Sequence, residues 1–185
     1  FTIPTTVTSI GKDAFFNCQK LTSLVIPTTV RSIGEGAFAN CKAITSIIIP
    51  KGITKIEDST FMNCEALTSV TIPNTVTSIG SGAFSSCKSL PSIAIPNTVT
   101  SIGEFAFASC SSLKYIEIPN SVISIKDAVF YGSGLKSIVI PNKVKIIEAS
   151  CFANCAFLEF VTIPDSVEWI NSKAFSNCKT LHSVS

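Results

Sequence analysis

The feature that most constrains this chain is an isoleucine–proline pair that recurs eight times along its 185 residues. Successive prolines are 23 residues apart, except for one interval of 22 residues. The prolines are Pro4, Pro27, Pro50, Pro73, Pro96, Pro119, Pro141 and Pro164. Self-similarity at a fixed period of this length is the signature of a solenoid, in which each unit packs only against its neighbours. The sequence therefore predicts one continuous stack of about eight units over residues 1–185, without a division into two globules.

Within one unit the spacing of the apolar residues changes midway, which indicates two kinds of local structure. Leu24 and Ile26 are two residues apart, as in a strand with one buried face. Between residues 14 and 21 the apolar residues recur at about one helical turn, which predicts a short helical or 3₁₀ segment. Residues 7–10 lie on a tight extended arc between them. Proline cannot donate to a ladder, so it marks where each strand stops pairing.

Two apolar columns run through every unit and define the predicted core. Isoleucine holds one column without a break: Ile10, Ile33, Ile56, Ile79, Ile102, Ile125, Ile147 and Ile170. Phenylalanine holds the other: Phe15, Phe38, Phe61, Phe84, Phe107, Phe130, Phe152 and Phe175. A single unit cannot bury its own apolar edge, but stacked copies can, with parallel strands about 4.8 Å apart.

The pattern breaks once, in the unit of 22 residues. Residues 131–134 read Y-G-S-G, one residue short, and the cysteine of the other units is missing. Two glycines let the shortened turn close. We expect a local irregularity there and no domain boundary.

Composition excludes several classes of protein. Apolar residues make up 46% of the chain and charged residues 14%, so a core is available and disorder is excluded. A net charge of +2 argues against a nucleic-acid surface, which is expected to be strongly basic. No apolar run reaches the roughly 18 residues that a membrane span needs. The chain begins and ends inside a repeat, so we expect it to be part of a longer protein.

The columns I-P-x-x-V-x-x-I-x-x-x-A-F-x-x-C-x-x-L-x-x-I resemble those of a known family, the BspA-like, or Treponema pallidum-type, leucine-rich repeat. The resemblance covers essentially all of residues 1–185. It implies a right-handed superhelix with a parallel β-sheet on the concave side and short helical, 3₁₀ or extended segments on the convex side. It also implies a bacterial or protist surface or secreted protein linked to adhesion. One repeat scaffold serves many ligands, so the functional part is an association.

Seven of the eight cysteines occupy one column, three residues after the phenylalanine. We interpret them as a ladder of free buried thiols that act as small apolar groups with a weak S–H donor. Stacked neighbours lie within disulfide reach on distance alone, but parallel side chains disfavour pairing. No C-x-x-C occurs, and Cys151 and Cys155 have no nearby histidine, so the sequence predicts no zinc site and no other metal site.

No catalytic constellation is visible. The one histidine, His182, lies at a variable position of the last unit, and no nucleophile is placed with it by the repeat. The carboxylates are scattered over variable positions, and no phosphate-binding loop or cofactor motif occurs. The sequence therefore predicts a protein that is not an enzyme and needs no cofactor.

The strand residues that point away from the core are the candidate binding surface. One outward column is serine except for Tyr115 and Phe160, and Glu117 lies beside Tyr115 on the same face. Exposed aromatic residues on an open sheet are candidate anchors for a protein partner. The predicted ligand-binding residues are Tyr115, Glu117, Phe160, Ile48 and Val139. Packing against a following repeat or a terminal cap is the alternative explanation of these aromatic residues, and of Trp169 and Phe157.

These observations lead to a principal hypothesis and its alternatives. The first is the repeat region of a cell-surface adhesin that binds host or matrix proteins through its concave face. The second is a structural spacer that holds another domain away from the cell surface. A weaker form of the first involves sulfated glycans on a group of lysines: Lys114, Lys126, Lys136, Lys143 and Lys145. A dimer formed end to end or through a sheet edge is also expected to be accessible.

Overall fold

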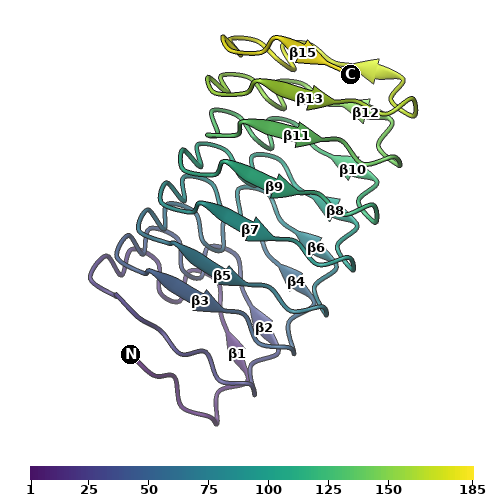
Figure 1. Ribbon diagram of the computed structural model, residues 1–185. Coiled ribbons are helices and arrows are strands. Elements are labelled where there is room, and N and C mark those ends of the chain that lie inside the picture. Colours follow the sequence, from purple (N-terminus) through teal and green to yellow (C-terminus); the bar gives the residue numbers. More distant parts are fainter.

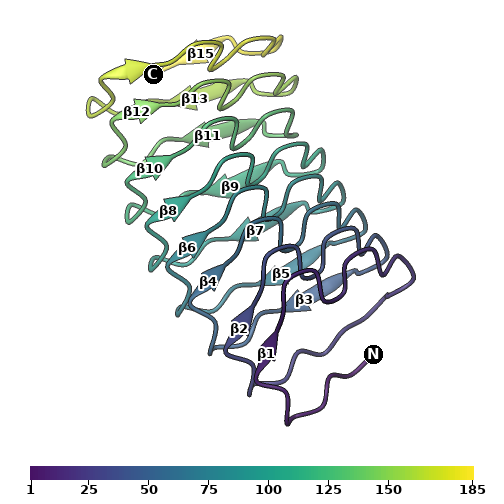
Figure 2. The same cartoon turned by 180° about the vertical axis from the view of Figure 1, so that it is seen from behind.

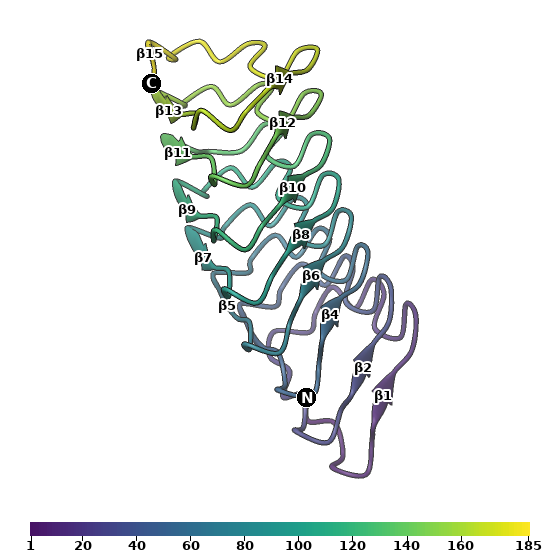
Figure 3. The same cartoon turned by 90° about the vertical axis from the view of Figure 1, so that its right-hand side faces the viewer.

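The computed structural model describes all 185 residues and contains fifteen short strands and no helix. Successive units lie on top of one another, and the two termini are at opposite ends of the stack (Figure 1). From the second unit onward, the units contribute strands to two parallel ladders, which lie on different sides of the coil (Figure 3). The predicted parallel-strand solenoid is therefore confirmed.

The first ladder, which we call the long-strand sheet, is the sheet that the sequence predicts before each proline. Its strands are β3 (Ser46–Ile48), β5 (Ser69–Thr71), β7 (Ser92–Ala94), β9 (Tyr115–Glu117), β11 (Ser137–Val139), β13 (Phe160–Thr162) and β15 (Ser183–Val184). All pairs are parallel, and β7 and β9 pair in register with Ser92 opposite Tyr115. The middle residue of most strands is buried and its two neighbours are exposed, as the predicted alternation requires.

The second ladder, the short-strand sheet, forms where the sequence predicts only an extended arc. Its strands are β1 (Ser9–Ile10), β2 (Ser32–Ile33), β4 (Lys55–Ile56), β6 (Ser78–Ile79), β8 (Ser101–Ile102), β10 (Ser124–Ile125), β12 (Ile146–Ile147) and β14 (Trp169–Ile170). From behind, these strands follow one another along the stack (Figure 2). The isoleucine column supplies the inward residue of every strand, and it is buried in all units before the last.

The prediction of a short helical or 3₁₀ segment between residues 14 and 21 is wrong, because this part of each unit is a series of turns. Two residues per unit have positive φ, for example Asp13 at 54° and Asn17 at 62°, or Gly at the same positions. A right-handed helix cannot contain them. The N–H of Phe15 donates to the carbonyl of Ala37 in the next unit, 2.8 Å away, and such bonds between units alternate with turn bonds inside the unit, as from the N–H of Phe16 to the carbonyl of Asp13.

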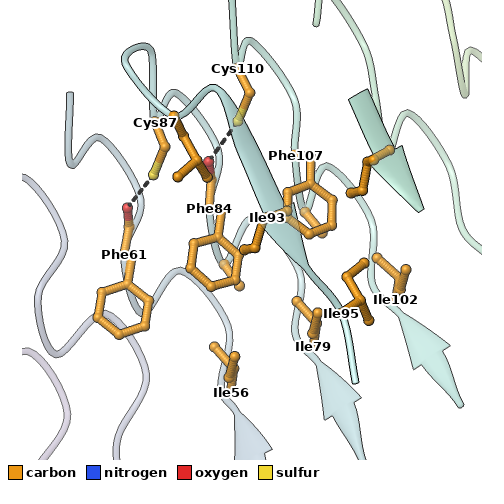
Figure 4. Packing of buried hydrophobic residues seen from close by; sticks show 14 of the residues in the cluster. Ile56, Phe61, Ile79, Phe84, Cys87, Ile93, Ile95, Ile102, Phe107 and Cys110 are labelled. Atoms are coloured by element: carbon orange, nitrogen blue, oxygen red, sulfur yellow. Dashed lines mark hydrogen bonds between the residues drawn. The ribbon is translucent and has the colours of Figure 1, made fainter. Parts of the chain in front are cut away.

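Phenylalanine stacking holds the turn side of the coil together. The eight rings of the column form one pile, with neighbouring ring centroids 5.2–5.8 Å apart and ring planes within 1–15° of each other. Phe61, Phe84 and Phe107 show this arrangement beside the isoleucine column (Figure 4). The six rings from Phe38 to Phe152 are fully buried, so the column is the centre of the core.

The cysteine column adds a polar ladder to this apolar core. The Sγ of Cys87 donates to the carbonyl oxygen of Phe61, at 3.3 Å, and Cys110 donates to Phe84 at 3.1 Å (Figure 4). The same bond recurs from Cys41, Cys64, Cys155 and Cys178. All eight cysteines are free thiols in the structure. The sulfur therefore acts as a donor that joins one unit to the previous one.

The short unit keeps this geometry with one residue fewer. Ser133 takes the cysteine position: it is buried, and its hydroxyl lies 3.4 Å from the Sγ of Cys155. Gly134 is needed because a Cβ there would overlap the carbonyl oxygen of Ser111 in the previous unit. Gly132 has positive φ, at 63°, but asparagine or serine holds that position in the other seven units. Only Gly134 is therefore required for closure.

Candidate ligand-binding face

The five predicted ligand-binding residues all lie on the outward face of the long-strand sheet. Their side chains are exposed, with relative exposures of 70% for Ile48, 64% for Val139, 57% for Tyr115 and 48% for Phe160, and Glu117 is exposed as well. Tyr115 and Phe160 stay exposed although a further unit follows each of them. The following repeat therefore leaves both side chains exposed, although it covers part of the Phe160 ring.

The structure brings three of the five residues together. Tyr115, Glu117 and Val139 line an open hollow of about 690 Å³ over β7, β9 and β11. Ile48 lies on β3, near the N-terminal end of the sheet, and Phe160 lies on β13, beyond the hollow. The ring of Phe160 instead meets the ring of His182 edge to face, with centroids 4.7 Å apart.

The hollow lies where the regularity of the sheet is lost. Small residues on β7, Ser92 and Ala94, leave space beside Tyr115 and Glu117 on β9. The hydrogen-bonded strand pairing is interrupted between β9 and β11, and the short unit lies between these strands. A second interruption, between β5 and β7, coincides with Pro91, which lacks the N–H that Thr68 donates to Thr45 one unit earlier.

Several residues of the hollow were not predicted as site residues. Asn120 and Pro141 form part of its wall, and both lie next to the ends of strands. Asn120 also lines an adjoining hollow of about 480 Å³, together with Glu117 and Lys143. Asn120 could have been identified from its position in the repeat. The residue directly after each proline is polar in every unit, which indicates an exposed position at the end of the strand.

Glu117 is the one charged side chain among the outward strand residues of the long-strand sheet. The four ion pairs of the structure lie elsewhere and join side chains of neighbouring units: Lys12–Glu35, Lys42–Glu65, Lys88–Glu65 and Lys145–Glu168. The carboxylate of Glu117 therefore has no cationic partner within the chain.

Two other aromatic residues are also exposed, Trp169 and Phe157, for which packing against a following repeat or a terminal cap was the alternative to binding. Trp169 lies on β14, the last strand of the short-strand sheet, and Phe157 lies in the turn before β13. Neither lines the hollow on the long-strand sheet. We therefore do not include them in the candidate face.

The buried thiols are not suited to nucleophilic chemistry. Burial raises the pKa of Cys64 and of Cys110 to about 12, so both stay protonated at neutral pH. No three side chains of His, Cys, Asp or Glu are grouped so that they could hold a metal ion. The structure also contains no helix that could cross a membrane.

Comparison with known proteins decides the family. A family model described as a BspA type leucine-rich repeat region (6 copies) matches residues 1–96 and 77–185, which together span the whole chain. The chain belongs to the BspA-type leucine-rich repeat family. No match was found among curated proteins.

Solved structures of bacterial leucine-rich repeat proteins are similar to this BspA-type chain. A leucine-rich repeat protein of T. pallidum is 27% identical, with a TM-score of 0.72 over 98% of this chain and 77% of its own. One from Bacteroides ovatus is 29% identical, with a TM-score of 0.62 over 95% and 69%. A leucine-rich cell surface protein from Faecalibacterium prausnitzii is 26% identical, with a TM-score of 0.50 over 99% and 77%. The predicted fold class, a leucine-rich-repeat solenoid, is confirmed.

Proposed function

We propose that this chain is a non-enzymatic protein-interaction module of a cell-surface or secreted adhesin, and that its partner lies across the long-strand sheet. The observation that carries the proposal is the hollow around Tyr115, Glu117 and Val139. The host or matrix proteins expected from the family resemblance are its candidate partners. The F. prausnitzii relative, which is described as a cell surface protein, supports the location.

The outward face has the composition of a binding surface. Large apolar side chains stand exposed on it at Ile48, Tyr115, Val139 and Phe160, although a folded chain gains free energy by burying such groups. Aromatic anchors surrounded by small residues are typical of the centre of a protein interface. The serines of the outer column add hydroxyl groups that can bond to a partner's backbone.

The scaffold is suited to holding such a face rigid. Each strand is fixed by the unit before it and the unit after it, through backbone bonds, cysteine donors and stacked phenylalanines. A rigid face loses little conformational entropy when a partner binds. A structural spacer would need the same rigidity but no exposed aromatic residues. Only the side chains of the outward face therefore distinguish an adhesin from a spacer.

The test is binding of the immobilised chain to extracellular-matrix proteins and to host cells. The native chain is compared with a Tyr115→Ser/Phe160→Ser variant and with a control, Phe16→Ser, which removes an aromatic ring that is 51% exposed in a turn. Circular dichroism first establishes that all three proteins are folded.

We expect the native chain and the Phe16→Ser control to bind, and the double variant to lose binding at least tenfold. Absence of binding by the native chain would favour the spacer. Equal binding by all three proteins would place the contact outside the long-strand sheet, and the lysine group would then be tested with sulfated glycans.

A further inference from the structure

We infer that the hollow between β7, β9 and β11 receives a lysine or arginine side chain from the protein partner. This inference rests on the proposed function, because it assumes that a protein lies across the long-strand sheet. It adds the chemical class of the residue that occupies the hollow.

The charge of the hollow points to a basic residue. Glu117 is its one charged residue, and no lysine or arginine of the chain forms an ion pair with the carboxylate. A purely apolar side chain in the hollow would strip water from this carboxylate and leave it unpaired, which is unfavourable. An acidic side chain would be repelled. A cation both pairs with the carboxylate and removes that cost.

The walls of the hollow fit the remainder of a basic side chain. Val139 and the ring of Tyr115 are exposed apolar surfaces that can cover the methylene groups of lysine or arginine. Tyr115 and Glu117 are two residues apart on β9, so their side chains leave the same face of the sheet about 7 Å apart. A cation held by the carboxylate therefore also lies within reach of the tyrosine ring, which attracts it.

Polar groups around the hollow can take the other hydrogen bonds of the cation. Ser92 and Ser137 line it from the neighbouring strands, and Asn120 lines it from the turn after β9. Their oxygen atoms are acceptors, as the several N–H groups of lysine or arginine require. The small size of Ser92 and Ala94 leaves the floor open to a long side chain.

A ligand of negative charge, such as a sulfated glycan, fits the same surface less well. It would need the lysine group close to the hollow to be free and unopposed. Lys145 is already paired with Glu168 at 3.0 Å. Glu117 lines both the hollow and the adjoining hollow that contains Lys143, so each of them carries a negative charge. A sulfate would be repelled there.

The experiment selects peptides from a displayed library of random 12-residue sequences on the immobilised chain, and measures their affinity at low and at moderate salt. The variants are Glu117→Gln, which removes the charge at constant size, and Glu117→Lys, which reverses it. The matched control is Glu104→Gln, because Glu104 is also exposed and also unpaired but lies away from the hollow. Thermal unfolding establishes that the variants fold alike.

We expect the selected peptides to share a lysine or arginine, and Glu117→Gln to weaken their binding about tenfold or more at low salt while Glu104→Gln leaves it unchanged. Glu117→Lys should restore binding to peptides in which that basic residue is replaced by glutamate. Peptides that need Tyr115 but are indifferent to Glu117 would overturn the inference and leave the proposed function standing.

Two further outcomes separate the inference from the proposed function. If no peptide is recovered and the matrix-protein assay is positive, the inference alone fails. If both are negative, the inference and the proposed function fail together.

Discussion

Replacing Phe84 by alanine tests the nearest-neighbour packing on which the stack depends. Phe84 is fully buried, and its ring lies between Phe61 and Phe107 with centroid distances of 5.4 and 5.6 Å. The substitution removes a whole ring and leaves a cavity that the ladders on both sides cannot close. Removal of a buried phenylalanine costs about 3–5 kcal/mol in the free energy of unfolding.

The same substitution at the end of the stack is the matched control. Phe175 contacts one ring of the column, that of Phe152 at 5.2 Å, and it is only partly buried. Less apolar surface returns to water and less of the cavity is enclosed, so we expect Phe175→Ala to cost less than half as much as Phe84→Ala. Phe84→Leu, which keeps most of the volume, should cost about 1–2 kcal/mol, because it loses mainly ring contacts.

The assay is urea unfolding at equilibrium, followed by circular dichroism, with thermal unfolding alongside it. For a chain of this size a loss of about 4 kcal/mol lowers the melting temperature by roughly 8–16 °C. A loss below about 1 kcal/mol for Phe84→Ala, or equal losses for Phe84→Ala and Phe175→Ala, would refute the view that the phenylalanine column is a continuous core. Unfolding in two separate steps would show that the middle units uncouple the two ends.

Two further predictions concern the thiols and the short unit. Burial raises the pKa of Cys64 and Cys110 from 9.0 to about 12, so their contribution to stability is complete below pH 9 and is lost as the pH rises toward 12. In reducing buffer, urea unfolding between pH 8.5 and 10.5 should show a stability that falls less steeply with pH in Cys64→Ala/Cys110→Ala, by about 1 kcal/mol per pH unit for each thiol removed, and an unchanged slope would contradict this. Gly134→Ala should lower stability by about 2 kcal/mol or more, because its Cβ meets the backbone of Ser111. Gly132→Asn, at a position that holds asparagine in five other units, should change stability by less than about 1 kcal/mol, and equal losses would argue against the close approach at Gly134.

The candidate site could be predicted only in part. That Tyr115, Glu117 and Val139 point outward follows from their alternation with the buried residues of β9 and β11. That they share one hollow, while Ile48 and Phe160 do not, depends on how neighbouring strands are placed. Asn120 and Pro141 were missed because they lie in turns, whose side chains have no fixed period from which a direction can be read.

The sequence by itself determined the number of units, the register between them and the residues of the core. Each apolar column has one position per unit, and stacked units can bury it only if like residues lie above like. This is why the pairing of Ser92 with Tyr115, and the pile of phenylalanine rings, followed from counting alone.

Only the tertiary structure decided how the coil runs between those columns. The helical spacing of residues 14–21 was misleading, because the N–H groups of Phe15 and Asn17 bond to the next unit and the backbone has positive φ at Asp13 and Asn17. The second sheet, the cysteine donors and the hollow arise in the same way. Each is a relation between units, and a pattern within one unit contains no information about the hydrogen bonds and space that a neighbour supplies.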